Sequence, residues 1–150
     1  MTSKVTHMAD VILNQLKSRE KEMLGFLGKL VSLESPSRNP KSQYQILKFI
    51  GKALGELGFY TLHVPGKETG GFLYARPQNR DKTKALQLMI GHCDTVWEMD
   101  SLKNMPLTKD GQTMKGPGIY DMKAGLTQII FALKAIDELN LTLPLTPVIL

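Results

Sequence analysis

One imidazole and two carboxylates stand out between Leu88 and Gly125 because their spacing can build a metal site. His92 and Asp94 lie two residues apart in GHCDTV, an extended segment in which their side chains project to the same side. Asp121 follows a Gly-Pro-Gly turn and opens a predicted helix. An imidazole binds a metal ion through one nitrogen, while nearby carboxylates set its orientation and basicity. These residue types point to metal-assisted chemistry.

Each of these residues also has a purely structural interpretation. A His and an Asp two residues apart can cap a turn, and Asp121 can be an ordinary helix N-cap. The Gly-Pro-Gly turn favours a functional Asp121, because it fixes a tight backbone path that an N-cap does not need. Cys93 is expected to turn away into packing. Lys123 either offsets the carboxylate charges or lies in solvent, and we expect solvent.

The elements around these residues must hold them in place. The apolar run Ala85–Ile90 predicts a strand buried on both faces, leading to His92 and Asp94. A helical pattern follows Asp121 from Met122 to about Asn140. The candidate residues are therefore expected in the crevice beyond the carboxyl ends of the strands, where α/β proteins usually build their sites.

The remaining pattern alternates helices with apolar strands and indicates a layered α/β protein. A first helix is predicted from Met8 to about Leu33, with a kink or break at Gly25 or Gly28. The turn Glu34–Pro40 precedes a second helix, in which Gly58 is expected to form the C-terminal cap. The expected inward stripe of this helix consists of Tyr44, Leu47, Ile50, Leu54 and Leu57. Further predicted segments are the strands Phe59–Val64 and Gly71–Arg76, the loop Pro77–Thr83, a hairpin over Pro106–Met114 with Asp110-Gly111 at its tip, and a strand over Pro144–Leu150.

Composition excludes several classes of function. A length of 150 residues suits one domain, and 42% hydrophobic with 22% charged residues is typical of a globular protein. The net charge of +5 is spread along the chain without a basic run, so nucleic-acid binding is not expected. The single cysteine, Cys93, excludes an intrachain disulfide. No apolar run approaches the ~20 residues of a membrane helix, and the N-terminus lacks an apolar signal core. Cytoplasmic residence is therefore expected.

Two blocks, GHCDTV and GPGIYDMKAG, together resemble a family of two-zinc hydrolases. That family includes glutamate carboxypeptidase, aminoacylase, acetylornithine deacetylase and succinyl-diaminopimelate desuccinylase. LVSLESPS at Leu30–Ser37 resembles the end of its N-terminal helix, and the form of both blocks is closest to the glutamate carboxypeptidase branch. The resemblance implies a three-layer α/β/α zinc-exopeptidase-like catalytic domain with a mixed sheet. It also implies two zinc ions, with cobalt as an alternative metal.

The resemblance gives each candidate residue a role. His92 would bind one zinc, Asp94 would be the supporting carboxylate that is not a ligand, and Asp121 would bridge both metals. A carboxylate suits the bridge because its two oxygens span ions about 3.5–4 Å apart. The resemblance further implies a cis peptide bond between Asp121 and Met122.

Part of the family's ligand set is missing from this sequence. The family takes its remaining ligands and its general base from an adjacent Glu pair, a later acid and a distant His, and no Glu-Glu pair occurs here. His7 and His63 lack the motif context and are expected at the surface, while Glu98 and Asp100 are expected to be loop polar groups. Residues 1–150 are therefore expected to be the N-terminal part of the catalytic domain, without its remainder and without the lid domain that mediates dimerisation. Alone, the chain is expected to be inactive and to bind zinc weakly or not at all.

For the parent protein, the resemblance implies a homodimeric zinc hydrolase that cleaves an amide bond through metal-activated water. The implied substrate is a small peptide or N-acyl amino acid with a free carboxylate, and release of a C-terminal glutamate is one candidate reaction. An N-acyl amino acid deacylase is the alternative within the family. A non-catalytic module that pairs through an exposed sheet edge is a rival from another class. A nucleic-acid-binding domain, resting only on the charge, is the weakest.

Overall fold

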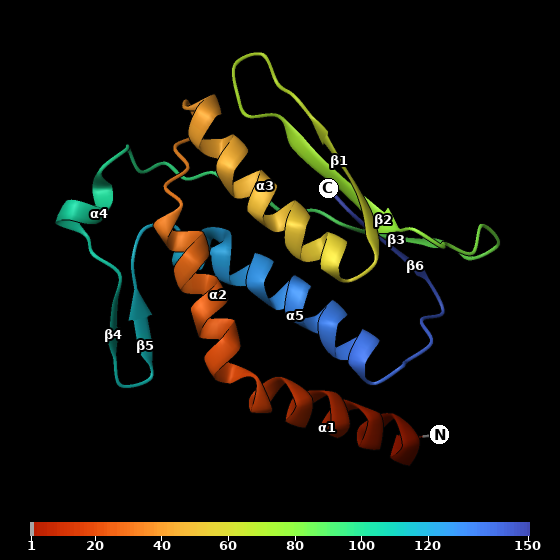
Figure 1. Cartoon of the computed structure of the whole chain (residues 1–150). Coiled ribbons are helices and arrows are strands. Elements are labelled where there is room, and N and C mark those ends of the chain that lie inside the picture. The colour runs from red at the N-terminus through yellow and green to blue at the C-terminus, as the bar shows by residue number, and fades with distance from the viewer. Residues whose placement is uncertain (1) are drawn as a thin grey trace.

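The computed structural model describes residues 2–150, with side chains from residue 7 onward. The chain forms a mixed α/β structure (Figure 1). The helices are α1 (Thr2–Ser18), α2 (Glu20–Ser32), α3 (Pro40–Glu56), α4 (Ser101–Asn104) and α5 (Ala124–Glu138), with a wide helical turn, η1 (Ile119–Lys123), before α5. The strands are β1 (Phe59–Val64), β2 (Phe72–Pro77), β3 (Leu86–Met89), β4 (Thr108–Asp110), β5 (Thr113–Lys115) and β6 (Thr146–Ile149). No helix in this described part of the chain is both long and apolar enough to cross a membrane.

The main sheet is mixed, as the resemblance implies. Its strand order is β1-β2-β6-β3, with β1 and β6 both antiparallel to β2, and β3 parallel to β6. The strands β4 and β5 form a separate antiparallel hairpin. Its tip carries the predicted Asp110-Gly111 turn, in which Gly111 has a φ of +54°.

Helices cover one face of the main sheet. Figure 1 shows α3 and α5 in front of the strands, with α2 beside α5 and α1 below it. Large apolar side chains on the sheet strands remain exposed, among them Tyr60, Leu62, Phe72, Leu86 and Leu88. The described residues thus supply the sheet and one helical layer. The second helical layer of the expected α/β/α arrangement stays a prediction.

The strand expected over Ala85–Ile90 differs in place and burial. It is confined to β3, and it is an edge strand rather than one buried on both faces: Leu86 is 60% exposed and Ile90 is 68% exposed. The inner position belongs to β6, whose four residues are all buried. A continuous apolar run shows that both faces of a strand could be buried. Whether they are buried depends on which other elements the tertiary structure packs against the strand.

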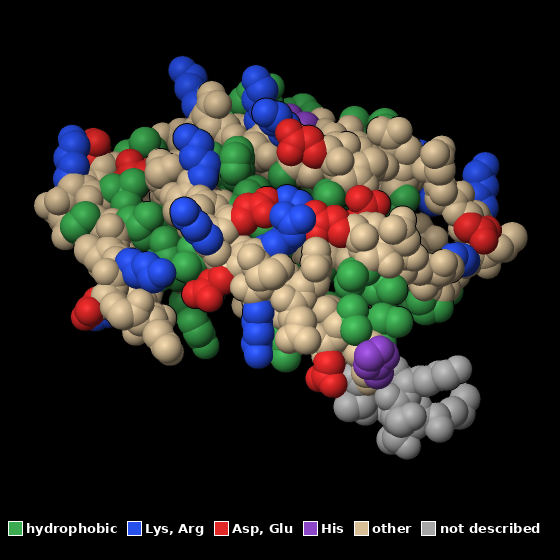
Figure 2. Space-filling view, turned by 60° about the horizontal axis from the view of Figure 1, so that its bottom comes forward, with side chains coloured by type: hydrophobic (Ala, Val, Ile, Leu, Met, Phe, Trp, Pro, Cys, Tyr) green, Lys and Arg blue, Asp and Glu red, His purple; other side chains and the backbone are tan. Residues whose placement is uncertain are grey.

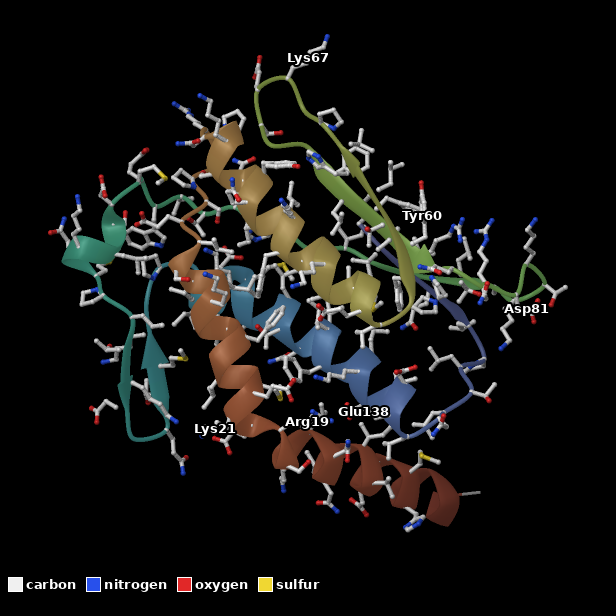
Figure 3. The ribbon with its side chains drawn as sticks, viewed as in Figure 1. Arg19, Lys21, Tyr60, Lys67, Asp81 and Glu138 are labelled. Atoms are coloured by element: carbon white, nitrogen blue, oxygen red, sulfur yellow. The ribbon has the colours of Figure 1, made fainter. Side chains whose placement is uncertain are left out.

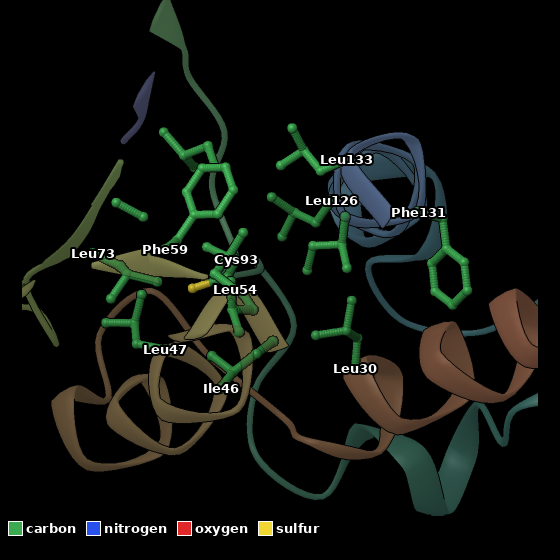
Figure 4. Close-up of a cluster of buried hydrophobic side chains, with 14 residues drawn as sticks. Leu30, Ile46, Leu47, Leu54, Phe59, Leu73, Cys93, Leu126, Phe131 and Leu133 are labelled. Carbon is green, nitrogen blue, oxygen red and sulfur yellow. The ribbon is translucent and has the colours of Figure 1, made fainter. Parts of the chain in front are cut away.

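The core lies between the sheet and the helices (Figure 4). It is a cluster of aliphatic and aromatic side chains from α2, α3, α5 and the strands, including Leu30, Ile46, Leu54, Phe59, Leu73, Leu126 and Phe131. Cys93 lies in this cluster and is 9% exposed, which confirms that its side chain packs inward. Burial raises the pKa of the Cys93 thiol to about 11, so the thiol is neutral near pH 7.

The long N-terminal helix breaks at Arg19, not at Gly25 or Gly28 as expected. The Arg19 guanidinium donates to Glu138 of α5, with Nε 2.9 Å from Oε2, and to Glu22 of α2 (Figure 3). Lys134 also pairs with Glu22, and charged side chains of both signs gather on the face shown in Figure 2. Gly28 lies inside α2, where an added Cβ would contact Leu107 near the hairpin at 3.5 Å. The break therefore follows tertiary ion pairs rather than local helix propensity.

The helix α3 begins and ends as its sequence predicts. Asn39 caps it by accepting from the Ser42 amide at 3.1 Å, Pro40 follows, and Gly58 after its end has a φ of +75°. Its expected inward stripe is confirmed at Leu47, Ile50 and Leu54, which are buried. Tyr44 is instead 46% exposed, and Ile46 is buried in the core.

Candidate metal centre

His92 and Asp94 lie on an extended loop beyond the end of β3, not on the strand itself. The loop is held from both sides: the Gly91 amide donates to the Leu150 carbonyl at 3.0 Å, and the buried Ser35 hydroxyl donates to the Cys93 carbonyl at 2.7 Å. Because Cys93 turns into the core, its two neighbours face away from it. The predicted alternation is therefore observed.

The Gly-Pro-Gly turn positions Asp121. Gly118 has a φ of +70°, and a Cβ there would lie 2.5 Å from Thr95 Cγ2, so only glycine fits this turn. Asp121 itself has an extended backbone, with a φ of −123° and a ψ of 97°. The Asp121–Met122 peptide bond is cis, as the resemblance implies. Lys123, not Asp121, occupies the N-cap position of α5, so the N-cap interpretation of Asp121 is wrong.

The three candidate side chains converge. His92 Nε2 lies 2.8 Å from Asp121 Oδ1, although the two residues are 29 apart in the sequence. The other ring nitrogen, His92 Nδ1, lies 3.1 Å from the Asp94 carbonyl oxygen and 3.5 Å from Asp94 Oδ1. The side chains of His92, Asp94 and Asp121 are 46%, 37% and 81% exposed, so the group is open to solvent.

The electrostatics of this group favour a cation. Partial burial lowers the pKa of His92, but the hydrogen bonds to Asp121 and to the Asp94 carbonyl raise it, and the net pKa lies above the ordinary value. When Nδ1–H donates to Asp94, His92 Nε2 carries a lone pair directed at a carboxylate oxygen. Two such acceptors stay close only with a proton or a metal ion between them. The donors present therefore fit zinc, which takes histidine nitrogen and carboxylate oxygen.

The donor set is partial. Across residues 7–150, whose side chains the structure describes, no three side chains of His, Cys, Asp or Glu are grouped so that they could hold one metal ion. A zinc site takes about four ligands. The structure brings together His92 and Asp121 as a donor pair, with Asp94 behind the imidazole.

Of the other histidine and acidic residues singled out in the sequence, His7, Glu98 and Asp100 are exposed as expected, whereas His63 is not fully at the surface. His7 is exposed, and His63 is partly buried, with Nε2 2.6 Å from the Gly70 carbonyl oxygen. Glu98 and Asp100 are exposed on the loop before the hairpin, where Glu34 accepts from the Asp100 amide at 2.9 Å.

A cavity of about 350 Å³ lies over the donor pair. Its lining includes His92, Asp94 and Asp121 together with Val96, Trp97 and Tyr120. Val96 and Tyr120 are 87% and 97% exposed, so the polar centre has an apolar rim. No lysine or arginine of the described residues lines this cavity.

Lys123 is the residue that the sequence interpretation missed. It was expected in solvent, but it is 1% exposed, and its Nζ donates to the Leu33 carbonyl at 3.0 Å. Burial lowers its pKa to about 8, against smaller opposing effects from Cys93 and Glu34. A lysine in the first turn of a helix carries no local sign of burial, because the cover comes from α2 and from the Gly118 turn.

Residues 88–150 match the model described as peptidase family M20/M25/M40, and this stretch contains His92, Asp94 and Asp121. This stretch is thus similar to that family over 63 of the 150 residues. The match confirms the resemblance drawn from the two sequence blocks.

A curated relative and several solved structures agree with this match. The N-formyl-4-amino-5-aminomethyl-2-methylpyrimidine deformylase of Bacillus subtilis (strain 168) is 26% identical over 142 residues, which cover 87% of this chain and 32% of the deformylase. Human carnosine dipeptidase 1 superposes with a TM-score of 0.79 at 20% identity, covering 93% of this chain and 33% of the dipeptidase. The Saccharomyces cerevisiae dipeptidase Dug1p has a TM-score of 0.76, at the same identity and with the same coverages. The structural likenesses establish the fold, and this chain spans about a third of the length of each relative.

Proposed function

We propose that this chain contributes His92, Asp94 and Asp121 to a zinc centre that hydrolyses an amide bond in a small substrate. The observation that carries the proposal is the 2.8 Å approach of His92 Nε2 to Asp121 Oδ1, within the stretch that matches the M20 family. The loop after β3 and the turn before α5, whose residues His92 and Asp121 are 29 apart in the sequence, meet at this point.

The three residues have separate roles in the proposal. His92 binds zinc through Nε2 and Asp121 through its carboxylate, whose exposure leaves room for a second ion. Asp94 orients the imidazole, because it accepts from Nδ1–H and so keeps the lone pair on Nε2. Zinc, when bound, polarises the substrate carbonyl and lowers the pKa of water toward neutrality.

The substrate class is supported by the comparisons and by the cavity. The relatives include two proteins named dipeptidases and one named a deformylase, so both a small peptide and an N-acyl compound are candidates. The deformylase favours the second, because it is the relative matched by sequence over 87% of this chain. Release of a C-terminal glutamate is a finer prediction. It requires cationic side chains for the substrate carboxylates, and the described cavity lining has none.

We further propose that residues 1–150 are the N-terminal part of a catalytic domain. The missing metal donors, the general base and a lid domain that forms the homodimer would then be supplied outside these residues. Two observations support this: the partial donor set, and relatives about three times as long as this chain. The rival interpretation, a non-catalytic module, is supported by the exposed edge strand β3.

Zinc binding tests the site directly. We expect the full chain to bind zinc weakly, and Asp121→Ala and His92→Ala each to lower the affinity at least tenfold, measured by equilibrium dialysis and metal analysis. Asp110→Ala is the matched control, because Asp110 is exposed at the hairpin tip, and it should leave binding unchanged. Equal binding by wild type and Asp121→Ala, or no binding by wild type at millimolar zinc, would contradict the proposed site.

Turnover assays test whether the site is complete. We expect no hydrolysis of dipeptides or N-formyl amines by the purified chain in the presence of zinc. Measurable turnover that Asp121→Ala abolishes would contradict the proposal that further residues complete the site.

A further inference from the structure

We propose that Lys123 is a positioning residue that sets the distance between His92 and Asp121, by fastening the turn that carries Asp121 to the end of α2. The metal-binding consequence of this inference rests on the proposed function. The positioning itself concerns only contacts within the chain.

The first step is how Lys123 holds its own turn. Its backbone amide donates to the Gly118 carbonyl at 3.0 Å, which closes the turn around Asp121. A Cβ at Gly118 would lie 3.5 Å from Lys123 Cδ and 3.4 Å from its Cε. The aliphatic stem of Lys123 therefore lies against the Gly-Pro-Gly turn that precedes Asp121.

The second step is where the ammonium goes. Lys123 Nζ donates to the carbonyl of Leu33, the residue that ends α2. A cation is favourable at the C-terminal end of a helix, where carbonyl groups lack intrahelical partners. No salt bridge to a carboxylate is found for this ammonium among the described residues, so a backbone carbonyl is its anchor.

The third step is that the same segment holds the loop of His92. Two residues after Leu33, the Ser35 hydroxyl donates to the Cys93 carbonyl at 2.7 Å, and the Ser35 carbonyl accepts from the Thr95 amide at 2.8 Å. Residues 33–35 therefore bind both halves of the site, the His92 loop through Ser35 and the Asp121 turn through Lys123. We call residues 33–35 the bracket.

This arrangement explains why a lysine is buried at position 123, where an apolar side chain would be enough for packing. A buried ammonium costs free energy unless it is held by hydrogen bonds, and methionine would fill the same space without that cost. A side chain that reaches the bracket supplies what methionine lacks, a hydrogen bond that fixes η1 relative to α2. The His92–Asp121 contact depends on that distance.

The test compares Lys123→Met with Lys109→Met, which makes the same exchange at an exposed hairpin residue. The first readout needs no metal: the NOE between the Met122 methyl group and the His92 amide, whose nitrogen lies 3.4 Å from Met122 Sδ. The second is the Kd for zinc, corrected for the folded fraction. We expect Lys123→Met to weaken the NOE at least threefold and the zinc affinity at least tenfold, and Lys109→Met to change neither.

The outcomes separate this inference from the proposed function. A wild-type NOE and wild-type zinc affinity in folded Lys123→Met would overturn the positioning role, even if its melting temperature fell, because a merely stabilising residue leaves the folded geometry intact. Loss of the NOE with no zinc binding in either protein would support positioning and contradict the metal site. If Lys123→Met does not fold, two NMR measurements on the wild type test the proposal. An NOE from Lys123 Hε to Gly118 Hα, together with slow hydrogen exchange of the Lys123 ammonium, supports it. The absence of both overturns it.

Discussion

At the scale of single residues, the chemistry of the site depends on which partner each polar atom of His92 has. Asp94 accepts from one ring nitrogen through its carbonyl, and Asp121 approaches the other through its carboxylate. Both contacts stabilise a positive charge on or beside the ring. A proton and a metal ion therefore compete for the same position between His92 and Asp121.

This competition predicts a pH dependence of zinc binding. Because the pKa of His92 is raised above its ordinary value of 6.5, protonation of Nε2 begins to oppose the metal at a higher pH than for a free imidazole. We expect the affinity to be constant above that pKa and to fall by up to about tenfold per pH unit below it. Isothermal titration with zinc from about pH 5.5 to about pH 8.5, a range that brackets the ordinary imidazole pKa, measures this dependence. His7→Ala should not change the curve, and a flat curve would contradict the role of His92.

The lowered pKa of Lys123 predicts that the stability of the folded chain also depends on pH. Its pKa is about 8 in the folded chain and 10.5 as a free side chain, so between these values the unfolded state binds more protons. Stability linked to this residue therefore rises with pH in that window, by up to about 3 kcal/mol, and the cost of the buried charge is fully present below pH 8. Urea unfolding of wild type and Lys123→Met across the window measures the difference. Parallel pH profiles of the two proteins would show that Lys123 titrates normally.

At the scale of elements, the site is made by one short segment between two helices. Residues 33–37 leave α2, hydrogen-bond to the loop after β3, and lead into α3. Pro36 and Thr95 pair as an isolated parallel bridge, so the two segments run side by side without belonging to a sheet. The end of β3 determines the position of His92 only approximately. The hydrogen bonds of residues 33–37 fix the position of the loop that carries His92.

Ser35 provides a test at this scale. Ser35→Ala removes the donor to the Cys93 carbonyl in a fully buried environment, and an unpaired buried carbonyl costs about 1–3 kcal/mol. We expect the free energy of unfolding to fall by about that amount, with a weaker zinc affinity in the folded state. Ser32→Ala is the matched control, because Ser32 donates to the Lys29 carbonyl on an exposed face of α2. Equal losses in the two variants would contradict the special position of Ser35.

At the scale of the whole molecule, the sheet has one covered face and one exposed face. Leu62, Phe72 and Leu88 are each about half exposed, and β3 presents an unpaired edge within the described residues. Exposed apolar surface of this kind favours association.

The exposed sheet surface predicts binding of a hydrophobic dye. We expect the purified chain to bind ANS, and Leu88→Lys to reduce the fluorescence by about half or more, because Leu88 lies on the exposed edge strand. Leu13→Lys changes a similarly exposed leucine on α1 and should have a smaller effect. Fluorescence that responds equally to both changes would place the dye elsewhere.

Several features could be predicted because each depends on a few neighbouring residues. Gly58 ends α3 since only a residue tolerant of positive φ fits there, and Asp110-Gly111 forms its hairpin for the same reason. The inward turn of Cys93 follows from the alternation of an extended chain. The break at Arg19, the exposure of β3 and the burial of Lys123 could not be predicted, because each depends on segments distant in the sequence: Glu138, β6 and Leu33.

The sequence by itself determined which groups this protein has for chemistry: one imidazole and two carboxylates, on loops whose local geometry their neighbours dictate. The tertiary structure decided how far apart those groups lie and what holds them there. The 2.8 Å between His92 and Asp121 is set by packing and by the hydrogen bonds of Ser35 and Lys123. Local backbone preferences act over a few residues, whereas a distance between segments 29 residues apart is fixed only when the whole chain packs.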